Sequence, residues 1–101
     1  MKAQKLSEHE LSAELKGLPR WTVTRDKLHR EYKFTDFVHA FSFMTASALL
    51  IEKMNHHPEW LNVYGRIVVD LTTHDSGGIT SKDVELAKGM DAFARQLGAV
   101  G

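Results

Sequence analysis

The sequence predicts an α+β fold in which three helices and a four-stranded antiparallel sheet form two layers, in the order α-β-β-α-β-β-α. Three segments carry apolar residues at helical spacing, and two pairs of short segments between them alternate apolar and polar residues around turn residues. The chain has 101 residues, 43% of them hydrophobic, and no cysteine. We therefore expect a single domain, residues 1–101, whose core forms without disulfides or thiolate metal sites.

The first and last helices are predicted from their N-terminal residues. Ser7 and Glu10 have the spacing of a capping box, in which each side chain bonds to the other residue's backbone N–H. Thr80 and Asp83 repeat that spacing before the last helix, and Gly98 is expected to end it.

The long middle helix is predicted to begin after Thr35 as N-cap, with Asp36 favourable at the positive end of the helix dipole. Apolar residues between Phe37 and Met54 cover much of its circumference, which indicates burial on more than one side. The second side faces either the core of the same chain or another subunit. The expected assembly is a homodimer or a homotetramer.

Each pair of strands is predicted to form a hairpin. Residues 21–34 form the first, with residues 25–27 as its turn, and residues 60–73 form the second. Gly65-Arg66 suits a two-residue type II′ turn, which has Gly at its first central position. In that register His57 faces His74 across the ladder.

This register brings three histidines together, because His56 lies one position before His57 at the corner between helix and strand. Glu52, one helical turn earlier, could orient the His56 ring. Imidazoles titrate near neutral pH, so such a cluster supplies both an acid and a base. Eliminating water requires both, one to protonate the leaving hydroxyl and one to remove a proton from the neighbouring atom.

The surrounding residues suit a flat polar ligand. Thr72 and Thr73 place hydroxyls beside the histidines, and Trp60 or Trp21 could form an aromatic wall. Structural interpretations also exist, since His favours the negative end of a helix, Asp83 suits a cap, and tryptophans commonly pack in the core.

A zinc site is the chemical alternative, because three histidines can bind the metal and leave a position for water. The sequence offers no clear acidic fourth ligand, and adjacent His56 and His57 would point apart in extended backbone.

Longer motifs narrow these alternatives. Residues 52–60 (EKMNHHPEW), residues 62–64 (NVY), residues 72–74 (TTH) and the later Asp83 together resemble the signature of the pterin-4a-carbinolamine dehydratase family. The resemblance extends over Trp21, the FSFMT stretch and the final helix, and so over nearly the whole chain.

That resemblance implies an α+β fold and a hydro-lyase that dehydrates 4a-hydroxytetrahydropterin to quinonoid dihydropterin, in tetrahydropterin recycling after aromatic amino acid hydroxylation. It implies no metal and no organic cofactor. It also implies catalytic roles for His56, His57 and His74, with His56 and His74 exchanging protons and His57 also shaping the pterin site. The substrate-binding residues it implies are Asn55, His57, Trp60, Thr72, Thr73 and Asp83.

Composition limits the other classes of function. Lys plus Arg equals Asp plus Glu, at 13 each, which argues against direct nucleic-acid binding. The N-terminal residues lack an apolar signal segment and no stretch reads as a membrane span, so we expect a cytoplasmic protein. The alternative function is a non-enzymatic interaction module, because mammalian members of the family also serve as dimerisation cofactors of a homeodomain transcription factor.

Overall fold

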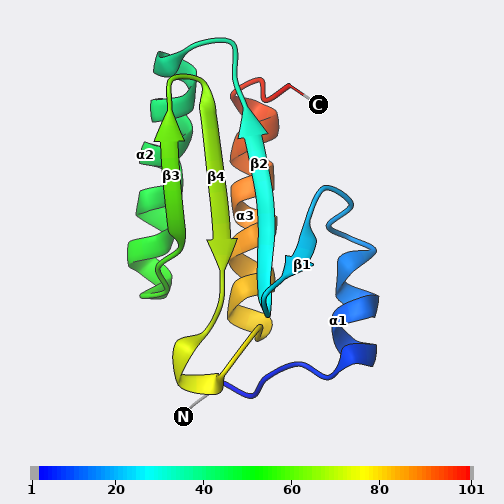
Figure 1. The fold of residues 1–101 in the computed structure, drawn as a ribbon. Coiled ribbons are helices and arrows are strands. Elements are labelled where there is room, and N and C mark those ends of the chain that lie inside the picture. Colours follow the sequence, from blue (N-terminus) through cyan, green and yellow to red (C-terminus); the bar gives the residue numbers. More distant parts are fainter. Residues whose placement is uncertain (1–2, 101) are drawn as a thin grey trace.

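A computed structural model describes residues 3–100 and has the expected order of elements (Figure 1). The predicted fold class is confirmed. The helices and strands are α1 (Glu8–Leu15), β1 (Thr22–Thr24), β2 (Lys27–Lys33), α2 (Phe37–Met54), β3 (Glu59–Val63), β4 (Arg66–Leu71), a 3₁₀ turn η1 (His74–Ser76) and α3 (Ser81–Gln96).

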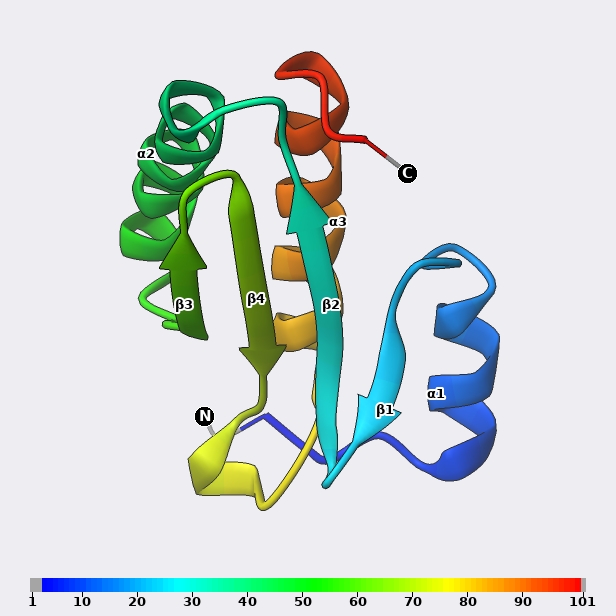
Figure 2. The same ribbon diagram turned by 45° about the horizontal axis from the view of Figure 1, so that its top comes forward.

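The four strands form one antiparallel sheet in the order β1-β2-β4-β3. Helices α2 and α3 cover one face of this sheet, and α1 lies beside β1 at its edge (Figures 1 and 2). The side chains that β4 buries, Ile67, Val69 and Leu71, alternate with polar or half-buried ones, as a strand with one covered face requires. The core therefore lies between the sheet and two helices.

Both capping boxes are present as predicted. Ser7 and Glu10 bond reciprocally at the start of α1, and Thr80 and Asp83 do so at the start of α3. The predicted cap of α2 is wrong, because Asp36 rather than Thr35 is its N-cap. The Asp36 carboxylate accepts a hydrogen bond from the His39 backbone N–H at 2.8 Å. A carboxylate accepts a backbone hydrogen bond and also interacts favourably with the positive end of the helix dipole, which explains why Asp36 is the cap.

Within the chain, α2 buries one face only. Ala40, Phe43, Ser47 and Ile51 are buried, so the expectation of burial on more than one side is not met by this chain alone. Large apolar side chains remain exposed elsewhere on the helix: Phe37, Val38, Phe41 and Leu49. None of the helices in residues 3–100 combines the length and the apolar character that a bilayer span needs.

The turn of the second hairpin is displaced from the prediction. Val63 pairs with Arg66, so Tyr64 and Gly65 are the two central residues, and Tyr64 takes the positive φ of 51°. Gly65 is needed for close approach, because a Cβ there would lie 2.5 Å from the carbonyl oxygen of Phe34. Gly65 correctly indicated a turn, but a glycine is required there because the backbone packs against the end of β2.

Candidate active site

A cavity of about 360 Å³ opens where the C-terminal end of α2, the end of β4 and the start of α3 meet. Its volume lies within the roughly 300–1,000 Å³ of small-molecule sites. The residues that line it come from these three segments and from η1: Asn55, His56, His57, Thr72, Thr73, His74, Asp75 and Lys82.

The end of α2 turns the chain toward this cavity. Asn55 follows the helix in the left-handed conformation, with φ 51° and ψ 46°. The His56 N–H then bonds to the Ile51 carbonyl at 3.2 Å, which is the long bond of a Schellman motif. Asn tolerates left-handed backbone better than most residues, so Asn55 has a conformational role besides lining the cavity. This turn places His56 and His57 directly after the helix.

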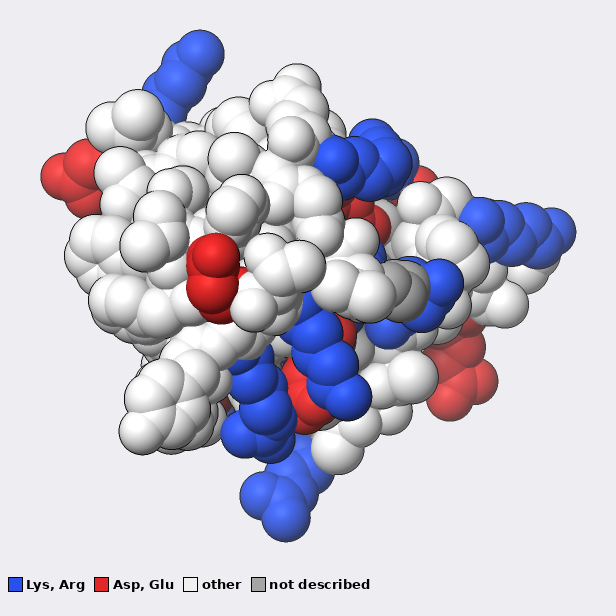
Figure 3. Space-filling model, turned by 90° about the horizontal axis from the view of Figure 1, so that it is seen from above, with Lys and Arg blue, Asp and Glu red and all other residues white. Residues whose placement is uncertain are grey.

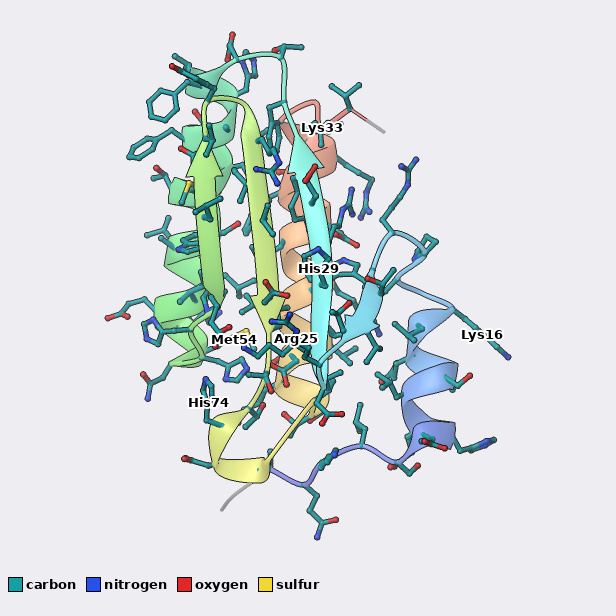
Figure 4. The ribbon with its side chains drawn as sticks, in the orientation of Figure 1. Lys16, Arg25, His29, Lys33, Met54 and His74 are labelled. Atoms are coloured by element: carbon teal, nitrogen blue, oxygen red, sulfur yellow. The ribbon has the colours of Figure 1, made fainter. Side chains whose placement is uncertain are left out.

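A short closed loop carries His74. Thr73 and Gly78 form an antiparallel bridge, with the Thr73 N–H bonded to the Gly78 carbonyl at 2.9 Å. The turn η1 lies inside this loop, and His74 projects from it toward the end of α2 (Figure 4). The bridge, and not a continued strand ladder, brings His74 to the other histidines.

The observed register of β3 and β4 also changes which residue faces His57. Carried past the end of the observed ladder, the pairing would set His57 opposite Thr72 instead of His74. The predicted pairing of His57 with His74 is therefore wrong in register, although both residues line the same cavity.

Asp83 lies behind the cavity lining and contacts two of its residues, His56 and Thr73. It has no exposed surface, and its Oδ1 lies 2.6 Å from His56 Nε2. Its Oδ2 accepts hydrogen bonds at 2.8 Å from the Thr73 hydroxyl and from the Thr80 backbone N–H. A buried carboxylate is stable only when such donors surround it.

The directions of these hydrogen bonds follow from the number of protons. The Thr73 hydroxyl has one proton, which it donates to Asp83, so the Thr80 hydroxyl must donate across the 2.8 Å that separates it from Thr73. A carboxylate oxygen accepts only, so the 2.6 Å contact with Asp83 fits the tautomer of His56 in which Nε2 carries the proton and donates it. The nitrogen of His56 that remains for a ligand is Nδ1.

The other two histidines are exposed. The His74 side chain is 76% exposed, and its Nε2 lies 3.4 Å from Oε2 of Glu59. Oε1 of Glu59 bonds to Lys27 Nζ at 2.6 Å, and this bond holds the pKa of Glu59 below its ordinary value. His57 Nε2 lies 3.8 Å from Glu52 Oε1. Glu52 therefore lies beside His57, and the expectation that it orients His56 is wrong.

The structure brings most of the predicted site residues together. Six of them line the cavity: Asn55, His56, His57, Thr72, Thr73 and His74. Asp83 lies beneath it and reaches a ligand only through His56 and Thr73.

The two tryptophans lie elsewhere. Trp60 is half-buried and lines an adjoining hollow of about 350 Å³, which shares His57 with the histidine cavity. Trp21 is buried in the core, with its indole bonded to Asp91 at 3.0 Å, so the alternative of Trp21 as a ligand wall is wrong.

Sequence reasoning missed Asp75 and Lys82, which also line the cavity. Asp75 follows His74 and Lys82 precedes Asp83, so adjacency to two predicted site residues was the available signal. Among the described residues no three His, Cys, Asp or Glu side chains are grouped as a metal site requires.

Comparison with known proteins identifies the family of the chain. A family model described as pterin 4 alpha carbinolamine dehydratase matches residues 4–93. A Solibacter usitatus protein named pterin-4-alpha-carbinolamine dehydratase is 62% identical over 90 residues, which is 89% of this chain and 95% of the relative. A Rhizobium rhizogenes protein of the same name is 51% identical over 96 residues, or 93% of this chain and 95% of the relative.

A solved structure has the same fold. The crystal structure of a transcriptional coactivator/pterin dehydratase from Brucella melitensis matches with a TM-score of 0.88 and 42% identity, over 90% of this chain and 99% of that one. The similarity therefore covers nearly the full length of each relative.

Proposed function

Because the chain belongs to the pterin 4 alpha carbinolamine dehydratase family, we propose that it is a hydro-lyase that removes water from 4a-hydroxytetrahydropterin in the histidine cavity. The observation that carries this proposal is the presence in one cavity of a histidine fixed by a buried carboxylate, His56, and a solvent-exposed histidine, His74. A separate reductase would then reduce the quinonoid dihydropterin to tetrahydropterin, in recycling after aromatic amino acid hydroxylation.

The reaction needs one proton donor and one proton acceptor. The bond between C4a and the hydroxyl oxygen breaks, and the oxygen takes a proton from the acid and leaves as water. The proton on N5 passes to the base, and its electron pair forms the C4a–N5 double bond of quinonoid dihydropterin. No electron or metal is required for the balance, so two side chains of suitable titration range are sufficient.

His56 is the base in this proposal. Its Nε2–H donates to Asp83, which leaves Nδ1 as the acceptor for the N5 proton. The imidazolium that forms would lie 2.6 Å from a buried carboxylate, which stabilises it as the charge develops. Asp83 in turn is held by Thr73 and Thr80, so the ring is fixed before substrate binds.

His74 is the acid. It is mostly exposed and lies 3.4 Å from Glu59, so it can exchange its proton with water between turnovers. His57, Asn55 and Thr72 line the remaining wall and would hydrogen-bond the polar edge of the pterin ring. Lys82 extends this wall on the side of α3.

The test is stopped-flow absorbance of synthetic 4a-hydroxytetrahydropterin mixed with the purified protein after treatment with a strong chelator. We expect quinonoid dihydropterin to form faster than in buffer, in proportion to protein concentration and without added metal. A rate equal to that in buffer would contradict the proposed activity. A rate restored only by added zinc would favour the metal mechanism.

A second candidate function is a protein-interaction module. The exposed apolar residues of α2 (Phe37, Val38, Phe41 and Leu49) favour it, because such patches commonly mark contact surfaces. The Brucella protein also carries the name transcriptional coactivator. An interaction module does not require the histidine cavity. Dehydratase activity that is lost when the cavity residues are replaced would therefore distinguish the enzyme from the interaction module.

A further inference from the structure

A second cavity, of about 260 Å³, shares no lining residue with the histidine cavity. It is bounded by α3, β2 and the segment between α1 and β1. Its lining residues are Gly17, Pro19, Arg20, Arg30, Asp91, Ala94, Arg95 and Ala99. We call it the arginine cavity.

Three guanidinium groups reach this cavity from three parts of the chain. Arg20 precedes β1, Arg30 belongs to β2, and Arg95 is in the last turn of α3. Arg30 is largely buried, and its guanidinium lies 4.1 Å from the centre of the Tyr32 ring. Arg20 and Arg95 are exposed, and neither has an ion pair or a side-chain hydrogen bond within residues 3–100. Seen from above, basic side chains gather around recessed acidic atoms at this end of the molecule (Figure 3).

Among residues 3–100, Asp91 is the one carboxylate that lines the cavity, and its oxygens are bonded to buried side chains. Its Oδ1 accepts hydrogen bonds from Arg30 at 2.7 Å and from the Tyr32 hydroxyl at 2.5 Å. Trp21 Nε1–H donates to both oxygens, at 3.0 and 3.1 Å. Burial, reinforced by the bond to Asp91, raises the pKa of Tyr32 far above its ordinary value, so this hydroxyl remains a donor. Asp91 therefore neutralises Arg30, and no carboxylate of the lining is left for Arg20 and Arg95.

Counted over the described residues, the lining consequently carries two positive charges in excess, from three arginines and one aspartate. In addition, the buried Nε of Arg30 has no hydrogen-bond partner. Unpaired buried donors are costly, and like charges gathered around a hollow are stabilised by an anion. Both features indicate a site whose ligand supplies acceptor oxygens and negative charge.

We propose that the arginine cavity binds the phosphate group of a small molecule. A phosphate monoester carries about −1.5 to −2 charges near neutral pH, which matches the excess, whereas a carboxylate supplies only one. Guanidinium groups bind phosphate oxygens through paired, geometrically matched hydrogen bonds. The cavity volume of about 260 Å³ is several times the roughly 30 Å³ of one water molecule, so the cavity can hold a phosphate together with part of the molecule that carries it. The site is independent of the dehydratase chemistry.

Two-dimensional NMR of the ¹⁵N-labelled protein tests this proposal, because the Trp21 indole N–H donates to Asp91 of the cavity lining and gives a separate signal. The protein is titrated with inorganic phosphate and, in a second arm, with ribose 5-phosphate, at constant ionic strength maintained with chloride. We expect a saturable shift of the Trp21 signal. Tighter binding of ribose 5-phosphate would identify a phosphorylated metabolite as the ligand, and equal binding would identify free phosphate.

Variants locate the binding. Arg20→Gln and Arg95→Gln should each weaken phosphate binding about tenfold, as expected for the loss of one charged hydrogen-bonding group. Lys16→Gln is the matched control, since it removes the same charge from a side chain that points away from the body of the protein (Figure 4). Its affinity should equal that of the parent. The proposal is overturned by the absence of a saturable shift, or by equal weakening in all three variants.

Discussion

Asp83 has two roles that one sequence pattern could not separate. Its position three residues after Thr80 predicts a helix cap, and Oδ2 does bond the Thr80 N–H. Its other oxygen holds His56, which lies 27 positions earlier in the chain. Spacing along α3 predicts the first role, but only the family resemblance connected Asp83 to the histidines. The sequence reports local contacts well, whereas a contact between helix ends depends on how the helices pack.

Asp83→Asn should lower kcat for carbinolamine dehydration by about 10- to 100-fold, because an amide cannot stabilise a charged His56 as a carboxylate does. It should also lower the free energy of unfolding by roughly 1–3 kcal/mol, since one donor of the buried network loses its acceptor. Both are measured on the purified variant, kcat by stopped flow and stability by urea unfolding.

Asp70→Asn is the matched control. It breaks a similar pair, Asp70 Oδ1 with His29 Nδ1 at 2.8 Å, on the open face of the sheet away from the cavity. Its kcat should equal that of the parent. If Asp83→Asn also retained full kcat, Asp83 would be a structural residue only.

At the scale of single elements, helix and strand positions were predictable and their ends were less so. The cap of α2 is one residue later than predicted, and the second hairpin turns one residue earlier. The N-terminal end of α2 is shifted because Asp36 is a stronger cap than Thr35. The hairpin turn is shifted because Gly65 packs closely against Phe34. The left-handed Asn55 that ends α2 had no signal beyond its residue type.

The buried face of α2 contains one unsatisfied hydroxyl. Ser47 has no exposed surface, and its Oγ has no hydrogen-bond partner. Ser47→Ala should therefore raise the free energy of unfolding by about 1 kcal/mol, since it removes a buried polar group and improves helix propensity. The measurement is the urea midpoint. Ser42→Ala in the same helix controls for propensity, and an equal gain in both variants would show that the buried hydroxyl costs nothing.

The Asp36 cap should make α2 sensitive to pH. Bonds from the His39 backbone N–H and side chain hold the pKa of Asp36 below its ordinary value. A carboxyl whose pKa is lowered by folding stabilises the protein above its unfolded-state pKa, and loses that contribution as the pH falls through the folded-state pKa. Asp36→Ala should thus unfold at a lower temperature than the parent at pH 7.

The difference between Asp36→Ala and the parent should narrow as the pH falls below about 4. Thermal melts across this range measure it. Glu85→Ala, an exposed carboxylate within α3, serves as the control and should show little difference at either pH. A gap that stays constant down to strongly acidic pH would mean that the cap acts without its charge.

At the scale of the whole molecule, residue pattern predicted the layers and the histidine cavity but not the arginine cavity. The histidines lie in two short motifs whose family resemblance is specific. In contrast, Trp21 and Asp91 are 70 positions apart, and Arg20, Arg30 and Arg95 form no motif in sequence. Their proximity arises only when β2 pairs with β1 and α3 packs beneath the sheet.

The exposed apolar residues of α2 predict a homo-oligomer. Val38 and Leu49 are 68% and 73% exposed, on a helix that already buries its other face. Light scattering at micromolar concentration should give a multiple of the 11.4 kDa chain. Leu49→Glu should lower that mass, while Val23→Glu on the edge strand β1 should not. A single 11.4 kDa species for the parent would contradict the prediction.

Acid–base dehydration in the histidine cavity depends on His56 and His74, so kcat of the folded His56→Ala and His74→Ala variants is the decisive measurement. The kcat of each variant should fall about 10²–10⁴-fold below that of the parent, which is the usual contribution of one positioned acid–base group. The rate of the spontaneous dehydration sets the lower limit. The double variant should cost less than the product of the single losses, because the two act as a unit. His9→Ala, an exposed histidine in α1, should keep full activity. Near-parental kcat in both His56→Ala and His74→Ala would mean that the histidine cluster is structural and that the proposed mechanism is wrong.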